Sequence, residues 1–355
     1  MPYESFLSSV IITGSYDTSC PTLPVPKIVT DIIHLSSFDE MAMRRISPEG
    51  LSWISEIQKG GVLTIGNFDG VHHGHASLIQ RVKQLASDAS RPASVVSFDP
   101  HPATLLRGGN APTRLMSMER RAEVMSDYGI EQLLICPVTR DFLQLSASQF
   151  FNSLVVDCLS ASAMVEGPNF FFGKNREGDQ VALSKLCHLN QIDLEIISPT
   201  EDDDLMISSS RVRELLIAGK VEAANTLLSR PHQIAGTVIA GASRGRQLGF
   251  PTANLNQIDA LVPSVGVYGG TASVGGKLYY AAIHIGPNPT FDDQTGRKIE
   301  VHLLDYDGDL YGVQMKVDFL TRLRDVTRFA SQDQLIVQLN RDIIAVRNYF
   351  KTESA

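Results

Sequence analysis

The stretch GNFDGVHHGH, residues 66 to 75, lies between an apolar run and a segment with helical periodicity, and it decides how the N-terminal half of the chain folds. The residues just before it, VLTI at 62 to 65, form the short β-branched run that is typical of a buried parallel strand. After it, apolar residues recur at helical spacing as far as Ala89, so the sequence predicts a helix that opens at about His75. The predicted unit is a strand, a glycine-rich turn and a helix.

A turn of this kind has the properties of an anion-binding site. The first N–H groups of the helix have no partner within the helix, and the helix dipole is positive at this end. Gly66, Gly70 and Gly74 remove side chains that would keep a phosphate from the backbone, while His72 and His75 carry ring N–H groups that donate to phosphate oxygens. Two other interpretations stay open. Closely spaced histidines are potential metal ligands, although no Cys, Asp or Glu lies at helical spacing to complete a set, and a glycine-rich turn can be purely structural.

Composition bounds the class of protein. The chain of 355 residues is long enough for two domains, with 43% hydrophobic and 20% charged residues. A net charge of −8 and a pI of about 5.6 argue against a nucleic-acid or membrane partner, because binding to phosphate backbones needs clustered Lys and Arg. The cysteines are Cys20, Cys136, Cys158 and Cys187. They are widely spaced and include no CxxC pair, which favours reduced thiols over disulfides. Without a secretory signal or a long apolar run, we expect a cytoplasmic protein.

Short apolar runs alternate with helical segments from Val62 to Ile197, which predicts a parallel, doubly wound sheet. The strand candidates that follow the first are residues 93–98, 132–136, 163–166 and 194–197. Ligands of such sheets bind at the carboxyl ends of the strands, which is where the glycine-rich turn lies.

Helix starts within this domain are marked by capping residues. Ser117 is a cap for a helix over 118–128, and SASQ at 146–149 is a capping box ahead of a helix over 150–159. We place this domain at residues 41–230. The preceding extension, residues 1–40, is rich in Ser, Thr and Pro at its start, which we expect to be flexible.

The string GNFDGVHHGH is similar to the adenylyltransferase module of bacterial bifunctional riboflavin kinase/FAD synthetases, and the order His72-x-Gly74-His75 resembles the nucleotidylyltransferase signature. The resemblance implies that the FMN phosphate attacks the α-phosphorus of ATP and that pyrophosphate leaves, with Mg²⁺ bridging phosphates. It implies that His72 and His75 stabilise the transition-state oxygens. The other nucleotide- and flavin-binding residues that it implies in this turn are Gly66, Asn67, Phe68, Asp69 and Gly74.

Further stretches of this domain carry the same resemblance. Asp99 and His101, in FDPHP, are assigned by it to the nucleotide and flavin pocket, and Asn169, in GPNFFFG, is assigned to an ATP contact. The sequence ISSSR at 207–211 resembles the family's ISSTR, with Ser210 in place of Thr. The resemblance makes Ser208 and Ser210 nucleotide-binding residues and places Arg211 on the departing pyrophosphate. Hydroxyl groups at a helix start are also good caps in any protein, so a structural interpretation stays open.

After Arg230 and Pro231 the segments become Val- and Gly-rich strands, which indicates a second domain at residues 231–355. Apolar and polar residues alternate strictly over 313–319 and 299–303, as in half-buried antiparallel strands. Such strands in a small domain predict a closed β-barrel. A capping box at 331–334 precedes a segment of helical periodicity, which predicts one amphipathic helix packed on the barrel.

The loop GASRGRQLGFPTAN, residues 241–254, is the candidate site of the second domain. It is not a Walker A sequence, and a glycine-rich hairpin alone is weak evidence for phosphate binding. Its ending in PTAN is similar to the riboflavin kinase loop in which threonine and asparagine oxygens hold Mg²⁺ with the nucleotide phosphates. By that resemblance Thr252 and Asn254 are the metal ligands. The other nucleotide- or flavin-binding positions that it implies here are Gly241, Gly245, Gly249, Asn288 and Thr290.

The sequence EVHL at 300–303 also matches, and Glu300 points to the face opposite Ile299 and Val301. A half-exposed strand carboxylate is usually inert, but the resemblance makes Glu300 the base that takes the proton from the ribityl 5′-hydroxyl of riboflavin. One position departs from the family. Arg324 is retained as a flavin-side residue, but Val326 stands where the family has a glutamate, which puts one flavin contact in doubt.

The two sets of motifs predict a bifunctional flavin-nucleotide synthase. Riboflavin and ATP give FMN and ADP in the second domain, and FMN and ATP give FAD and pyrophosphate in the first. The implied partners are these small molecules, with ATP as co-substrate. Two rival hypotheses are an adenylyltransferase for another phosphorylated acceptor with an inactive barrel, and a non-catalytic flavin-binding protein.

Overall fold

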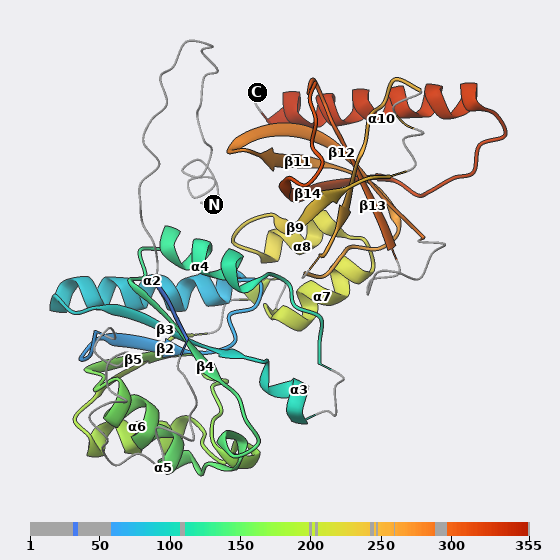
Figure 1. Cartoon of the computed structure of the whole chain (residues 1–355). Helices are drawn as coiled ribbons and strands as arrows, with labels where there is room; N and C mark the ends of the chain where they lie inside the picture. Colours follow the sequence, from blue (N-terminus) through green and yellow to red (C-terminus); the bar gives the residue numbers. More distant parts are fainter. Residues whose placement is uncertain are drawn as a thin grey trace.

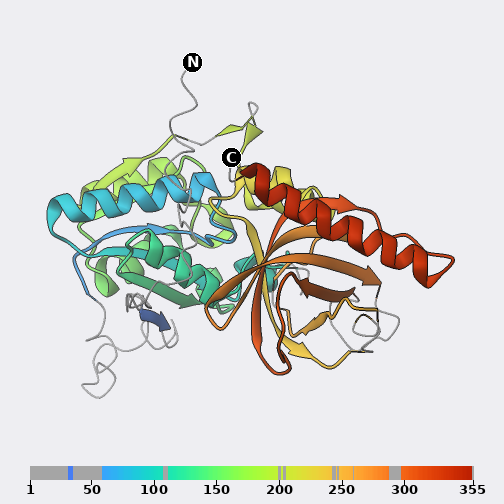
Figure 2. The same cartoon turned by 90° about the horizontal axis from the view of Figure 1, so that it is seen from above.

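A computed structural model describes the two parts of the chain shown in Figures 1 and 2, an α/β sheet domain and a β-barrel with a long C-terminal helix. The described residues are 31–34, 58–106, 111–198, 201–202, 205–241, 245, 248–258, 260–287 and 297–353. For residues 31–34, 201–202 and 205 only the backbone is described. The start of the extension, which we expected to be flexible, lies outside this set, as do the candidate residues Asn288 and Thr290. Residues 31–34 of the extension form a strand of the first sheet, so this sheet begins before residue 41, where we placed the start of the domain.

The sheet of the first domain is parallel throughout, with the order β1-β4-β3-β2-β5-β6. Its strands are β1 (Asp31–His34), β2 (Val62–Ile65), β3 (Ala93–Asp99), β4 (Gln132–Pro137), β5 (Ala163–Glu166) and β6 (Asp193–Ile196). The strand order reverses at β2, which has β3 on one side and β5 on the other. This confirms the doubly wound prediction and puts the glycine-rich turn at the topological switch point.

The sheet divides at the carboxyl end of β2. Pairing between β2 and β3 continues as far as Ile65, which is opposite Val96, whereas pairing between β2 and β5 stops at Leu63, opposite Met164. Beyond Leu63 no pairing joins the two strands, and at this point Gly66, Glu166 and Gly167 line a crevice.

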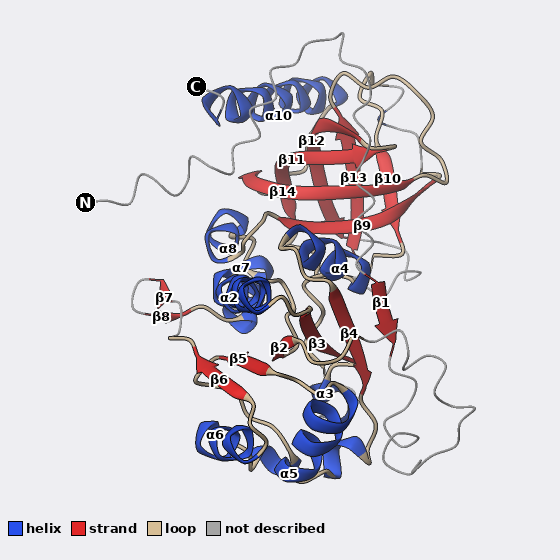
Figure 3. Cartoon of the chain, turned by 90° about the vertical axis from the view of Figure 1, so that its left-hand side faces the viewer, coloured by secondary structure: helices blue, strands red, loops and turns tan. Residues whose placement is uncertain are grey.

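Helices cover both faces of this sheet (Figures 1 and 3). Successive strand residues point to opposite faces, so Val62 packs with α2 and α4 residues, whereas Leu63 and Ile65 pack with the layer formed by α5 and α6. The α-helices of the domain are α2 (His73–Ala89), α3 (Pro102–Leu106), α4 (Met118–Asp127), α5 (Ala147–Phe150) and α6 (Gln180–Leu189), followed by α7 (Ser209–Ile217) and α8 (Val221–Leu227). The described cysteines, Cys136, Cys158 and Cys187, are free and buried.

Two local expectations need correction. The helix after the turn begins at His73, two residues earlier than expected, because His72 is its cap. The helix expected over 150–159 is a short α-helix, α5, that continues as a π-helical stretch over Phe151–Cys158. In addition, β7 (Glu201–Asp202) pairs with β8 (Leu205–Met206) as a small antiparallel sheet.

The second domain is a closed antiparallel barrel with the order β10-β13-β12-β11-β14-β9, as predicted. Its strands are β9 (His232–Ile239), β10 (Ala253–Asn256), β11 (Gly266–Val274), β12 (Lys277–Pro287), β13 (Arg297–Leu303) and β14 (Gln314–Arg324). Buried and partly exposed residues alternate along β9 and β13, which places one face of each strand in the barrel core. The predicted C-terminal helix is α10 (Gln332–Glu353), and it lies across one side of the barrel (Figure 1).

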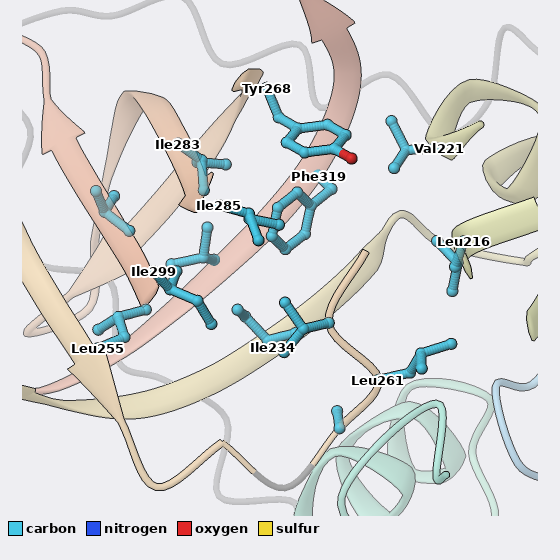
Figure 4. Packing of buried hydrophobic residues seen from close by; sticks show 14 of the residues in the cluster. Leu216, Val221, Ile234, Leu255, Leu261, Tyr268, Ile283, Ile285, Ile299 and Phe319 are labelled. Atoms are coloured by element: carbon cyan, nitrogen blue, oxygen red, sulfur yellow. The ribbon is translucent and has the colours of Figure 1, made fainter. Parts of the chain in front are cut away.

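The two domains share a hydrophobic core. Figure 4 shows Leu216 of α7 and Val221 of α8 near the barrel residues Tyr268 and Phe319, and all four belong to one buried cluster. Polar contacts add to it: the backbone N–H of Leu261 donates to the carbonyl of Arg114 at 2.7 Å. The helix that begins at the ISSSR sequence therefore joins the sheet domain to the barrel.

Candidate active sites

The glycine-rich turn brings two histidine rings together. The rings of His72 and His75 stack with their centroids 3.7 Å apart and an interplanar angle of 18°. His72 is the N-cap of α2, and its Nδ1 accepts a hydrogen bond from the backbone N–H of His75 at 3.3 Å. The remaining proton of a neutral His72 ring is therefore on Nε2. Nδ1 of His75 is buried and has no hydrogen-bond partner among the described residues.

Both rings are uncharged near neutral pH. Burial, together with the neighbouring His73, lowers the pKa of His72 from 6.5 to about 4. Burial, with the nearby His72 and Arg121, lowers the pKa of His75 well below its usual value. The pair can therefore donate hydrogen bonds to a phosphate, but the positive potential at this point comes from the start of α2 rather than from the rings.

A cavity of about 260 Å³ opens at the crevice beside these histidines. The predicted site residues that line it are Gly66, Phe68, His72, Gly74, His75 and Asn169. Asn169 is exposed and its Nδ2 donates to Sδ of Met206, 3.1 Å away on β8. The structure therefore brings the turn and the GPNFFFG loop to one cavity, as ligand binding at a switch point requires.

Sequence reasoning did not single out Glu166, which also lines this cavity. Glu166 ends β5, is 2% exposed, and its Oε1 accepts the backbone N–H of Ile65 at 2.8 Å. Ile65 lies beyond the point where pairing of β2 with β5 ends, so no backbone carbonyl of β5 accepts its N–H. The Glu166 carboxyl group accepts this N–H in place of a backbone carbonyl. Burial raises the pKa of Glu166 well above its usual value. No spacing signal in the sequence distinguishes such a residue from an ordinary strand end.

The ISSSR sequence lies beside the turn. Oγ of Ser209 donates to the backbone carbonyl of Asp69 at 2.7 Å, and Ile207 lines the cavity. Ser208 caps α7 by accepting the N–H of Arg211 at 3.3 Å, so the capping interpretation is correct for this serine. Ser210 is exposed and Arg211 is half-buried at the start of the helix. The binding roles of these residues stay predictions.

Asp69 is the centre of a buried network. Its carboxylate accepts the backbone N–H groups of Leu115, at 2.9 and 3.0 Å, and of Met116, at 3.2 Å. Arg213 forms a direct ion pair with it, and a guanidinium nitrogen of Arg121 lies 3.7 Å away. Burial and these contacts give Asp69 a structural role, and its predicted nucleotide or flavin contact stays a prediction. Sequence reasoning missed Arg213.

Other predicted residues of this domain lie elsewhere around the turn. Asn67 has a buried Oδ1 without a partner among the described residues, and its carbonyl accepts Oγ–H of Ser97 at 3.1 Å. Asp99 pairs with Arg114, and Nδ1 of His101 accepts the N–H of Ala103 at 3.1 Å. Asp99 ends β3 and His101 follows it, on the far side of β2 from β5, and neither residue lines the cavity described above.

The barrel contains a larger cavity of about 400 Å³. Its walls are largely apolar and include Phe250 from the loop, Ile283 from β12, and Leu335 and Leu339 from α10. The predicted site residues that line it are Gly245, Thr252, Glu300 and Arg324. A mostly apolar cavity with a few convergent polar groups is the usual form of a small-molecule or cofactor site.

Glu300 is held by two donors. Its Oε1 accepts Nζ of Lys298 at 2.6 Å, and its Oε2 lies 3.1 Å from Nδ1 of His284. Hydrogen bonds from His284 and Lys298 lower the pKa of Glu300 to about 2, although partial burial acts in the opposite direction. The carboxylate is therefore ionised at any ordinary pH.

A second cavity of the barrel, about 280 Å³, adjoins the first at Thr252, which lines both. Its wall includes Tyr306, Asp307 and Tyr311. Asn254, which follows on the same strand β10, is buried, and its Oδ1 has no hydrogen-bond partner among the described residues.

The glycines of the loop make this close packing possible. A Cβ atom at position 241 would lie 2.1 Å from Nδ2 of Asn254, so the asparagine occupies the space that any side chain at Gly241 would need. At Gly245 a Cβ would lie 2.3 Å from the carbonyl oxygen of Phe250, and Gly249 has a positive φ of 85°. Gly245 and Gly249 are therefore favoured for backbone reasons, and Gly241 is favoured by the packing of Asn254, whatever ligand the loop contacts.

At the other end of the large cavity, Arg324 is fixed by Asp342 of α10. Two guanidinium nitrogens donate to the two carboxylate oxygens at 2.8 and 2.7 Å, and Gln338 donates to the same carboxylate at 2.9 Å. Val326 lines the cavity beside them and is 38% exposed. Asp342 was missed because the helical periodicity of α10 marks only its apolar residues.

Comparison with known proteins gives matches over most of the chain. A family model described as FAD synthetase matches residues 54–211, and one described as riboflavin kinase matches residues 228–350. The bifunctional riboflavin kinase/FMN adenylyltransferase of Pseudomonas fluorescens is 36% identical over 298 residues, covering 84% of this chain and 96% of that protein. The protein of the same name from Bacillus subtilis is 33% identical over 301 residues, covering 84% and 95%.

A solved structure described as a macrolide-efflux protein from Streptococcus pneumoniae has a TM-score of 0.75 at 30% identity, and the match covers 83% of this chain and 97% of that one. Within the described part of this chain, no helix is long and apolar enough to cross a membrane. Nor do three His, Cys, Asp or Glu side chains gather there as a potential metal site.

Proposed function

The chain belongs to the family of bifunctional riboflavin kinase/FMN adenylyltransferases, and from this premise we propose how its cavities divide the two reactions. The protein phosphorylates riboflavin with ATP to give FMN and ADP, and it adenylylates FMN with ATP to give FAD and pyrophosphate. We assign FAD formation to residues 41–230 and FMN formation to residues 231–355. The observation that carries the assignment is the presence of separate cavities, one at the glycine-rich turn and one in the barrel.

In the sheet domain, the cavity at the crevice receives ATP with its phosphates at the start of α2. His72 donates from Nε2, since its Nδ1 is taken by the backbone, and His75 lies stacked against it. Both rings are neutral, so they stabilise developing charge on the α-phosphate as hydrogen-bond donors. Arg211, at the start of α7, neutralises the leaving pyrophosphate. Alignment and charge neutralisation are the whole of the catalysis, because adenylyl transfer to a phosphate needs no nucleophilic side chain.

In the barrel, the large apolar cavity receives the flavin ring, and the adjoining cavity receives the nucleotide. Thr252 supports this division because it lines both cavities and therefore lies where the transferred phosphate must pass. Glu300 lies in the flavin cavity and is directly opposite Asn254 in the pairing of β13 with β10. The proton-transfer group and the nucleotide-holding loop are therefore neighbours.

Thr252 and Asn254 are the residues that would hold Mg²⁺. The buried Oδ1 of Asn254, without a donor among the described residues, fits a hard cation that prefers oxygen ligands. Mg²⁺, when bound with the nucleotide, neutralises phosphate charge and orients the transferred group. The proposed setting is the cytoplasm, where ATP and the flavins are the partners.

Product analysis after incubation with riboflavin, ATP and Mg²⁺ tests the whole proposal, because FMN, ADP, FAD and pyrophosphate should all form. His75→Ala combined with Arg211→Ala should abolish FAD formation and leave FMN formation nearly intact. Thr252→Ala should have the opposite effect when FMN is supplied for the FAD assay. Loss of both products in either folded variant would contradict the division between the two domains. An absence of FMN from the wild-type protein would favour the rival with an inactive barrel.

A further inference from the structure

Glu166 is a buried carboxyl group of the sheet domain that has no part in the adenylyl transfer proposed above. It is 2% exposed, yet it lines the cavity at the crevice between β2 and β5. Its Oε1 accepts the backbone N–H of Ile65 at 2.8 Å, and its backbone carbonyl accepts the N–H of Ile197 at 2.9 Å. Glu166 is therefore fixed on the side of the cavity that β5 and the segment after β6 form.

The surroundings of Glu166 favour its neutral form. Burial raises the pKa of Glu166 well above its usual value, although the hydrogen bond from Ile65 acts in the opposite direction. None of the ion pairs among the described residues includes Glu166. His72 and His75 on the α2 side are uncharged near neutral pH. On α6, burial and the nearby Glu166 raise the pKa of the Cys187 thiol to about 12, so this neighbour is uncharged as well.

The proton of this neutral carboxyl group belongs on Oε2. Oε1 accepts the Ile65 N–H, and the carbonyl oxygen of a carboxylic acid is its better acceptor, so the hydroxyl group is the other oxygen. The Thr64 hydroxyl is close enough to act on the pKa of Glu166, but its Oγ1 is buried and has no hydrogen-bond partner among the described residues. Glu166 therefore offers one O–H donor to a ligand in the cavity.

The two sides of this cavity differ in chemistry. The α2 side carries the glycine-rich turn with His72 and His75, where we place the phosphates. The Glu166 side carries the apolar side chains of Phe170 and Ile197. An apolar wall with one polar group suits the flat face and the edge of a purine better than it suits a phosphate. The base is therefore the part of ATP that lies beside Glu166.

We propose that Oε2–H of Glu166 donates a hydrogen bond to a ring nitrogen of the adenine of ATP, which makes Glu166 a specificity-determining residue for FAD formation. This inference rests on the proposed assignment of the cavity to ATP. An unprotonated ring nitrogen of adenine is an acceptor and matches a single O–H donor, whereas an ionised carboxylate has acceptors only. A buried donor also discriminates between ligands, because a base without the matching acceptor leaves the O–H unsatisfied.

Deaza analogues of ATP test this contact, because each replaces one ring nitrogen of adenine by C–H. The substrates are ATP and its analogues without N1, N3 or N7, each with supplied FMN, and the measurement is kcat/KM for FAD formation by the full chain. In the wild-type protein we expect one analogue to be poorer than ATP by about 10–100-fold, as for the loss of a hydrogen bond that leaves a buried donor unpaired. The loss should lie mainly in KM, since the base does not take part in the bond changes.

Three substitutions of Glu166 separate the contact with the base from a purely structural role. The amide of Glu166→Gln keeps an acceptor for Ile65 and a donor for the base, so this variant should retain the wild-type order of substrates. Glu166→Met has a side chain of similar length, and Glu166→Val favours a strand, but neither carries a donor. Both should use ATP about 10–100-fold less well and show no further loss with the sensitive analogue.

The control substitution is Glu195→Gln on the neighbouring strand β6. The Glu195 side chain is 40% exposed and pairs with Arg81, and it does not line the cavity. This variant should keep the wild-type preference among the four nucleotides. FMN formation by the barrel of each variant is the internal control for folding.

The proposal is overturned if no deaza analogue is poorer than ATP with the wild-type protein, a result that needs no variant. It is also overturned if the loss with the sensitive analogue persists in Glu166→Met and Glu166→Val, because another group then contacts that nitrogen. Equal losses in Glu166→Gln and Glu166→Met would likewise contradict the donor role and leave Glu166 only its contact with Ile65. A failure of the underlying site assignment looks different: His75→Ala with Arg211→Ala would then leave FAD formation intact.

Discussion

Replacing Asp69 with Asn should destabilise the sheet domain far more than the same substitution in an exposed ion pair. The Asp69 side chain is 4% exposed and lies against two arginines that are themselves almost buried, Arg121 at 5% and Arg213 at 12%. It also accepts the backbone N–H groups of Leu115 and Met116, which hold the segment leading into α4. The substitution keeps the shape of the side chain but removes its charge and one acceptor oxygen.

The loss of stability arises because two buried guanidinium groups, those of Arg121 and Arg213, lose the negative charge that neutralises them. Breaking a buried ion pair from one side typically costs about 3 to 5 kcal/mol, because the remaining charge is left without a partner. A domain with a total stability of about 5 to 15 kcal/mol loses a large fraction of it. At about 2 to 4 °C per kcal/mol for a domain of this size, the melting temperature should fall by roughly 6 to 20 °C.

The measurement is urea unfolding and calorimetry of the full chain without ligands. Asp127→Asn is the matched control, since it removes the same charge from an ion pair with Arg230 in which the Asp127 side chain is 60% exposed. Exposed pairs contribute about 0 to 1 kcal/mol, so this variant should unfold almost like wild type. If Asp69→Asn also costs less than about 1 kcal/mol, the network is not a stabilising centre.

Three other perturbations should have measurable effects. Burial lowers the pKa of His232 to about 4, so between pH 6.5 and 4 the unfolded state binds more protons than the folded state. The free energy of unfolding should therefore fall by about 3 kcal/mol as the pH drops through that range. The same pH series on His232→Gln should show a smaller loss of stability. Burial raises the pKa of Glu166, so this residue increasingly opposes folding as the pH rises above 4.5. Chemical unfolding should therefore show that the stability of Glu166→Gln relative to wild type is greater at pH 8 than at pH 5. An equal difference at both pH values would contradict a neutral Glu166. Asp342→Asn should weaken the contact between α10 and Arg324 and raise the KM for riboflavin several-fold, without changing FAD formation from FMN. Steady-state kinetics measure this, and an unchanged KM for riboflavin would show that the ion pair does not shape the cavity.

The sequence alone determined the architecture and the candidate motifs, because these depend on short-range patterns. Strict alternation over 313–319 predicts a half-buried strand, and Met315, Val317 and Phe319 are all fully buried in the barrel. The strand, glycine-rich turn and helix around residues 62–89 are likewise local, since β-branched residues, glycines and helical spacing act within a few residues of one another.

Only the tertiary structure decided which charged groups meet. Asp69 and Arg213 are 144 positions apart, and no local pattern indicates that α7 would place this arginine against the turn. Glu166 is an ordinary strand end until the pairing of β2 with β5 stops before Ile65 and leaves an N–H for its carboxyl group. His284 and Glu300 meet because β12 pairs with β13 in one register, and a shift of one residue would put the two side chains on opposite faces. Such contacts depend on register and on packing between distant segments, which hydrophobic periodicity does not specify.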